Sequence, residues 1–137
     1  MDAKKIITVF GATGAQGGGL VRAIATDPGS EFSVRAVTRD VNSDKAKALA
    51  ALGAEVVHGD LGDATSVDKA LEGAYGAYFV TFYWAHFSPE QEKAEAAMFA
   101  KAAKKAGIKH AIWSTLEDTR ELVPLDDNRM PTLMGKY

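Results

Sequence analysis

A glycine-rich turn near the start of the chain restricts the available folds more than any other feature. Residues 6–10 form an apolar, β-branched run, and residues 15–25 carry an amphipathic pattern. Gly11, Gly14 and Gly17 lie between these two runs with the spacing Gly-x-x-Gly-x-x-Gly. This order predicts a strand, a tight turn and a helix, joined as in nucleotide-binding domains.

Each glycine of the turn has its own physical role. Gly11 permits a sharp exit from the strand, Gly14 lets a pyrophosphate approach the backbone, and Gly17 lets the helix pack closely on the strand. The N–H groups of the first helical turn, with the positive end of the helix dipole, would then face the phosphates. The alternative is an ordinary glycine-rich connection, and the strand and helix alternation downstream argues against it.

Five strand patterns alternate with four helix patterns along the chain. The expected strands span residues 5–10, 32–38, 54–58, 77–82 and 108–114. The expected helices span residues 15–26, 43–52 and 89–106, with a third helix in chain order that begins between residues 63 and 65 and ends at Gly73. This alternation predicts an α/β fold, a doubly wound parallel sheet of the Rossmann type in strand order 3-2-1-4-5. Residues 1–115 would form this core. Residues 116–137 would form an irregular tail with one short helix near residues 130–134.

Several helix and core details are predicted residue by residue. Thr65 and Asp68 have capping-box spacing at the start of the third helix. The fourth helix is expected to begin with Ser88 as its N-cap, followed by a proline. Its inner face is expected to consist of Ala96, Phe99, Ala100 and Ala103. Trp113, on the fifth strand, is expected to lie in the core.

The residues after the second strand bear on the choice of cofactor. Ligands of a doubly wound sheet bind at the carboxyl ends of its strands. NAD sites usually place a carboxylate there for the ribose 2′-OH, whereas NADP sites offer an arginine for the 2′-phosphate. Thr38 occupies this end and Arg39 follows it, which favours NADP with NAD as the weaker alternative. Asp40 argues the other way, and Arg39 could also be an ordinary solvated loop residue.

The ends of the third and fourth strands supply the remaining candidates. Asp60 could accept a hydrogen bond from the adenine amino group while Leu61 packs on the ring, or Asp60 could simply be a turn residue before the third helix. Thr81 is expected beside the middle of the cofactor. Phe82 and the two aromatic residues after it would line the nicotinamide side. His86, in the same loop, lies nearest to a substrate position, and the catalytic residues stay unassigned.

Composition excludes several classes of function. The chain has no cysteine, which excludes disulfides, thiolate metal sites and a cysteine nucleophile, and no metal site is predicted. Its formal net charge is −2 without a basic stripe, so no direct nucleic-acid surface is expected. There is no apolar run of about 18 residues and no signal-peptide pattern, so we expect a cytoplasmic protein that does not enter a membrane.

Four segments of the chain form a recognisable combination: Val9 to Gly18, Arg35 to Arg39, Gly53 to Asp60 and Trp113 to Glu117. Together they resemble the NmrA-like family of atypical short-chain dehydrogenase/reductases. The resemblance covers nearly the whole chain and is much more specific than the glycine spacing alone. It implies a core that binds NADP or NAD. Some members of that family are redox sensors and transcriptional co-regulators without turnover, and others reduce quinones or related small molecules.

The resemblance also implies roles for particular residues of this chain. The phosphate loop would run from Gly11 to Gly17, with close contacts from Thr13, Ala15 and Gln16. Arg39 would bind the 2′-phosphate, Asp60 and Leu61 the adenine, and Thr81 would be the contact from the fourth strand.

Two departures from the family pattern affect the expected activity. Relatives often carry Gln-Gly-Lys in the fourth helix, where this chain has Glu95-Ala96-Ala97, so a nicotinamide-side contact is expected to be looser. Family members are about twice as long, and we expect residues 116–137 to begin a truncated second half. No Tyr-x-x-x-Lys pair is present either, so little dehydrogenase turnover is expected from this chain alone.

Overall fold

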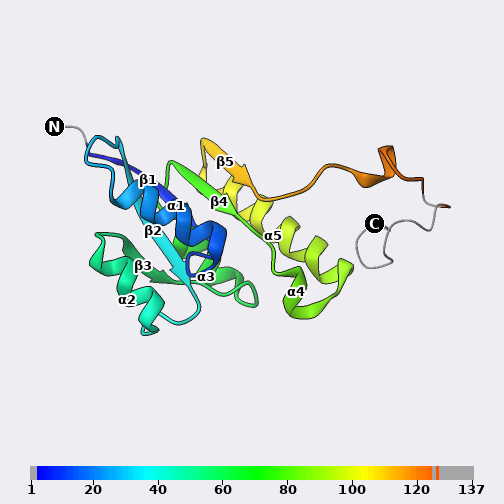
Figure 1. Ribbon diagram of the computed structural model, residues 1–137, viewed down its shortest axis with the longest axis horizontal. Coiled ribbons are helices and arrows are strands. Elements are labelled where there is room, and N and C mark those ends of the chain that lie inside the picture. The colour runs from blue at the N-terminus through cyan, green and yellow to red at the C-terminus, as the bar shows by residue number, and fades with distance from the viewer. Residues whose placement is uncertain (1–2, 125, 127–137) are drawn as a thin grey trace.

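The computed structural model describes residues 3–124 and 126, and it contains one parallel sheet in the order β3-β2-β1-β4-β5 (Figure 1). The strands are β1 (Lys5–Val9), β2 (Phe32–Thr38), β3 (Glu55–His58), β4 (Gly76–Phe79) and β5 (His110–Trp113). The helices are α1 (Ala15–Ala25), α2 (Asp44–Ala51), α3 (Ala64–Leu71), α4 (Tyr83–His86) and α5 (Pro89–Ala106), followed by the 3-10 helix η1 (Thr119–Glu121). The predicted fold class and strand order are confirmed.

Helices cover both faces of the sheet because side chains alternate along the strands. On β1, Ile7 and Val9 pack with Val21 of α1 and Leu49 of α2 in one apolar core. Thr8 points to the opposite face, where its buried hydroxyl donates to the Ala70 carbonyl at 3.1 Å. The sheet is therefore held by packed helices on both of its faces.

The second core lies between the sheet and the pair of helices α3 and α5. Phe10, Phe79 and Phe99 contact one another there, with ring centroids 4.8 to 5.6 Å apart. The predicted inner face of α5 is partly wrong, because Ala100 is exposed. The helix is rotated so that Glu95, Phe99 and Ala102 are its buried residues, which turns the Glu95 carboxylate toward Phe82 and α4.

Other differences from the predicted elements concern loops and edges. The aromatic loop forms the short helix α4, which no pattern predicted. Asp63, rather than Thr65, is the N-cap of α3, and its carboxylate accepts from the N–H groups of Thr65 and Ser66. Trp113 is 38% exposed because β5 is an edge strand, although its ring contacts Phe79 and Phe99. The helix expected near residues 130–134 lies outside the described residues.

Candidate functional site

The glycine turn has the geometry that its sequence predicts. Gly11 leaves β1 with a φ of +61°, in the left-handed region that favours glycine. Gly17 sits so close to the turn that an added Cβ would lie 2.3 Å from the Gly11 carbonyl oxygen. Gly14 is more open, with only that same oxygen near its Cβ position, at 3.2 Å. The start of α1 is therefore held tightly against the end of β1.

The start of α1 has no group of its own to balance the helix dipole. Gly14 is its N-cap, without a side chain to accept from the N–H groups, and its first turn contains no acidic residue. Exposed N–H groups with uncompensated positive partial charge bind anions well.

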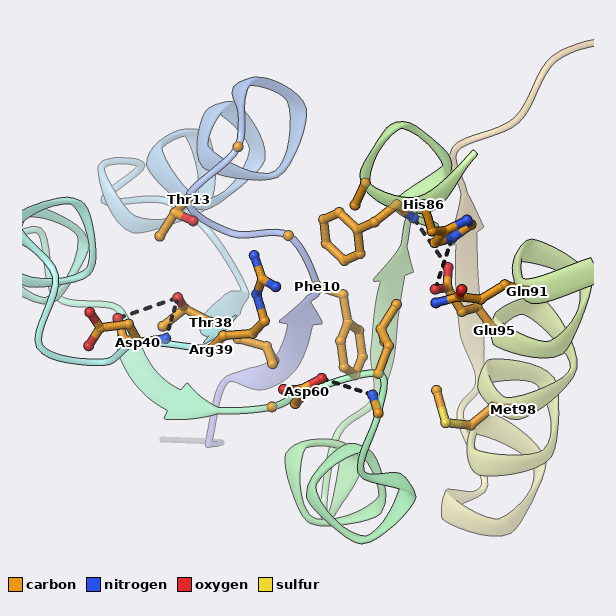
Figure 2. A pocket seen from close by; sticks show the side chains of 18 of the residues that line it. Phe10, Thr13, Thr38, Arg39, Asp40, Asp60, His86, Gln91, Glu95 and Met98 are labelled. Carbon is orange, nitrogen blue, oxygen red and sulfur yellow. Dashed lines mark hydrogen bonds and ion pairs between the residues drawn. The ribbon is translucent and has the colours of Figure 1, made fainter. Parts of the chain in front are cut away.

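A cleft of about 820 Å³ opens beside this turn, along the carboxyl ends of the strands (Figure 2). One end is formed by the loop after β2, the floor by Phe10 and the segment after β3, and the other end by α4 and α5. Eight of the predicted site residues line the cleft: Gly11, Thr13, Gly14, Thr38, Arg39, Asp60, Leu61 and Phe82. The fold thus gathers residues from four separate loops around one space.

The end of the cleft beside β2 carries positive charge without a protein partner. The exposed guanidinium of Arg39 makes no hydrogen bond or ion pair with residues 3–124. Asp40, which argued against an NADP site, has its carboxylate turned into its own loop, where Oδ1 accepts the Asn42 N–H at 2.9 Å. Lys45 lines the same cleft.

Asp60 has the hydrogen bonds of a turn residue and also lines the cleft. Its Oδ1 accepts the Gly62 N–H at 2.8 Å, as expected of a turn residue, and its backbone N–H donates to Ser66 Oγ at 2.9 Å. The same residue lines the cleft with Leu61, so these bonds fix the Asp60 side chain at the edge of the cleft.

A buried carboxylate closes the opposite end of the cleft. Glu95 is 7% exposed, and its Oε2 accepts the Phe82 N–H at 3.3 Å. Its Oε1 lies 3.2 Å from His86 Nε2, without the alignment of a full hydrogen bond (Figure 2). His86 Nδ1 accepts the Ser88 N–H at 3.0 Å, so in the neutral ring the proton is on Nε2. Both ring nitrogens of His86 therefore face protein groups.

Four predicted site residues lie outside the cleft. Ala15 and Gly17 are in the first turn of α1 and do not line the cleft. The Thr81 hydroxyl donates to Glu92 Oε1 at 2.6 Å. Gln16 extends toward β4 and β5, where its Oε1 accepts from Tyr78 Oη at 2.6 Å and from Ser114 Oγ at 2.7 Å.

None of the predicted site residues lies on α5, although this helix contributes to the cleft. The residues that this helix supplies are Gln91, Ala94, Glu95 and Met98. Gln91, Glu95 and Met98 have the i, i+4 and i+7 spacing of one helix face. That spacing could have indicated a shared surface, but the alanine-rich pattern suggested a different face.

Within residues 3–124, no three histidine, aspartate or glutamate side chains gather as metal ligands would. No helix in the described part of the chain is long and apolar enough to cross a membrane.

Comparison with known proteins gives consistent matches. Residues 3–134 match the NmrA-like family. The NmrA-like family domain-containing oxidoreductase notA of an Aspergillus species is 38% identical over 125 residues. That match covers 86% of this chain and 36% of the relative, so the chain spans about a third of the length of this relative.

Solved structures agree with the fold and contain ligands. NmrA, a negative transcriptional regulator in complex with NADP, has a TM-score of 0.74 at 32% identity, over 90% of this chain and 37% of that one. The triphenylmethane reductase of a Citrobacter species, complexed with NADP(H), has a TM-score of 0.65 at 37% identity, over 78% and 36%.

Proposed function

Because this chain belongs to the NmrA-like family, we propose that it binds NADP(H) in the cleft and forms the dinucleotide-binding part of an oxidoreductase. The observation that carries the proposal is Arg39, whose side chain has no protein partner within residues 3–124, at one end of a cleft that begins at the glycine turn. Small carbonyls or quinones are the proposed substrates. Residues 1–115 are the proposed dinucleotide-binding core, and residues 116–137 the beginning of a second half.

The shape of the cleft supports a defined orientation of the dinucleotide. The pyrophosphate lies over Gly14 at the start of α1, where the backbone is open to it. The adenosine half occupies the cleft, with the base against Leu61 and within reach of Asp60. Its 2′-phosphate meets Arg39, and Lys45 adds a second positive charge at that end.

Replacing Arg39 tests the choice of cofactor. A charge-assisted hydrogen bond contributes about 1.5 to 3 kcal/mol, so we expect NADP to bind at least about tenfold more tightly than NAD. Arg39→Ala should remove most of this difference, because it should lower the affinity for NADP and leave the affinity for NAD almost unchanged. Isothermal titration calorimetry with both dinucleotides measures it.

Arg22→Ala is the matched control for charge, since Arg22 is exposed on α1 and does not line the cleft. It should keep the preference for NADP. Equal affinities for NADP and NAD in the unmutated chain would contradict the proposal.

A regulatory function is the second candidate. It is favoured by the similarity to a negative transcriptional regulator, which is also bound to NADP, and by the absence of a Tyr-x-x-x-Lys pair from the sequence. In this case NADP would change how the protein engages a protein partner. Multiple turnover of NADPH with a panel of quinones and carbonyls, lost in a variant that cannot bind the cofactor, would identify an oxidoreductase instead.

We also propose that the chain forms a homodimer through β5. In the described residues β5 pairs only with β4, and its other edge leaves backbone groups unpaired. Ile112 is 39% exposed and Leu116 80%, an apolar surface beside that edge. Light scattering after size exclusion should give a dimer whose fraction rises with concentration, and Ile112→Lys should lower it. A monomer at every concentration would instead favour a tail that covers the edge.

A further inference from the structure

Three polar side chains meet on the β4–β5 side of the glycine turn, outside the cleft. Gln16 comes from the first turn of α1, Tyr78 from β4, and Ser114 directly follows β5. The Tyr78 and Ser114 hydroxyls both donate to Gln16 Oε1, at 2.6 and 2.7 Å. Tyr78 is 7% exposed and packs in the α1 core, so its hydroxyl is a fixed anchor for the amide.

These two bonds determine which end of the amide remains for a ligand. A carbonyl oxygen has two lone pairs, and both are occupied here. The amide nitrogen makes no hydrogen bond with the described residues, and the Gln16 side chain is exposed. The Gln16 amide nitrogen can therefore donate two hydrogen bonds, and it suits a ligand atom that is a hydrogen-bond acceptor.

The strand order indicates which part of a dinucleotide reaches this place, an argument that rests on the proposed function. Connections run from β1 outward to β3 on one side and from β4 outward to β5 on the other, so the order reverses between β1 and β4. Dinucleotides bind across such a reversal. If the adenosine half fills the cleft beside β2, the nicotinamide half extends over β4 and β5, where Gln16 lies.

We propose that the Gln16 amide N–H donates to the carboxamide oxygen of the nicotinamide ring, and that Tyr78 and Ser114 are positioning residues that keep the amide in this orientation. The interaction fixes the rotation of the carboxamide. It gives the first turn of α1 a role in recognising the ring in addition to the phosphates.

Comparing two ligands in the full 137-residue chain tests this assignment. NADP⁺ and 2′-phospho-ADP-ribose share the adenosine and pyrophosphate groups, and only NADP⁺ carries the ring. Gln16→Met keeps the length of the side chain and removes its polar atoms. We expect this variant to lower the affinity for NADP⁺ about fivefold to tenfold, which is the effect of losing one hydrogen bond. The affinity for 2′-phospho-ADP-ribose should stay within about twofold of its value in the unmutated chain.

Two further variants separate this role from a structural one. Gln91→Met changes a glutamine on the adenosine side of the proposed ligand, so the ratio of the two affinities should stay as in the unmutated chain. The double variant Tyr78→Phe, Ser114→Ala removes both hydrogen bonds to the Gln16 amide oxygen. It should lower the affinity for NADP⁺ about twofold to fourfold and leave the affinity for 2′-phospho-ADP-ribose unchanged.

The 3-acetylpyridine analogue of NADP⁺ tests the direction of the bond, since it keeps the carbonyl oxygen and lacks the carboxamide N–H groups. The Gln16→Met variant should bind this analogue more weakly than the unmutated chain does, by the same factor as for NADP⁺. Equal affinity of the analogue for the variant and for the unmutated chain would overturn the assignment. Equal weakening of NADP⁺ and 2′-phospho-ADP-ribose by Gln16→Met would place Gln16 at the phosphates and also overturn it. Failure of 2′-phospho-ADP-ribose to bind the unmutated chain would overturn the proposed function and this inference together.

Discussion

Replacing Gly17 by alanine is expected to lower the free energy of unfolding by about 3 kcal/mol or more, because the new methyl group would overlap the backbone. Its Cβ would lie 2.3 Å from the Gly11 carbonyl oxygen, 2.8 Å from the Gly11 carbonyl carbon and 3.0 Å from the Phe10 carbonyl oxygen. None of these atoms belongs to a side chain that could rotate away. Relief requires α1 to move off the end of β1.

Gly19→Ala is the matched control for this prediction, two residues further along the same helix. No atom lies within 4 Å of its Cβ position, so the change should stabilise the protein by about 0.5 to 1 kcal/mol through helix propensity. Urea denaturation followed by circular dichroism measures both variants. Equal stabilities for Gly17→Ala and Gly19→Ala would contradict the close packing of α1 on the turn.

Gly14→Val is expected to reduce NADP affinity at least about a hundredfold while leaving the fold in place, because the branched side chain occupies the proposed position of the pyrophosphate. The fold tolerates the change better than at Gly17, since only the Gly11 oxygen is near the Cβ position, at 3.2 Å, and φ is −81°. Calorimetric titration with NADP measures the affinity, and circular dichroism checks the fold.

Gly29→Val provides the control for this second prediction. Gly29 lies in the turn between α1 and β2, where its Cβ position is only in ordinary contact with Asp27, and it does not line the cleft. This variant should bind NADP as the unmutated chain does. Normal NADP binding by Gly14→Val would mean that the cofactor does not lie across the glycine turn.

The parts of the fold that could be predicted are those dictated by local chemistry. The spacing of Gly11, Gly14 and Gly17 specifies a strand, a turn and a helix, and β/α alternation then restricts the sheet to few arrangements. The N-cap at Ser88 was also predicted from the sequence, and in the structure its hydroxyl accepts the Gln91 N–H. Such features depend on residues a few positions apart.

The parts that could not be predicted depend on contacts between distant segments. The rotation of α5 follows from packing Phe99 against Phe10 and Phe79, which are distant in sequence, and it turns Glu95 inward instead of Ala100. An alanine-rich helix has little contrast between apolar and polar faces, so its sequence does not predict which face is buried. The exposure of Trp113 likewise depends on the edge position of β5 and not on its own apolar character.

The direction of the Gln16 side chain was also beyond sequence reasoning, because its partner Ser114 is 98 residues away. This bond joins the first turn of α1 to the residue that follows β5. During synthesis, the glycine turn emerges from the ribosome early, but its contact with β5 must wait until residue 114 has been made and has paired with β4. A nascent chain therefore acquires the complete set of contacts around the turn only after the fifth strand has joined the sheet.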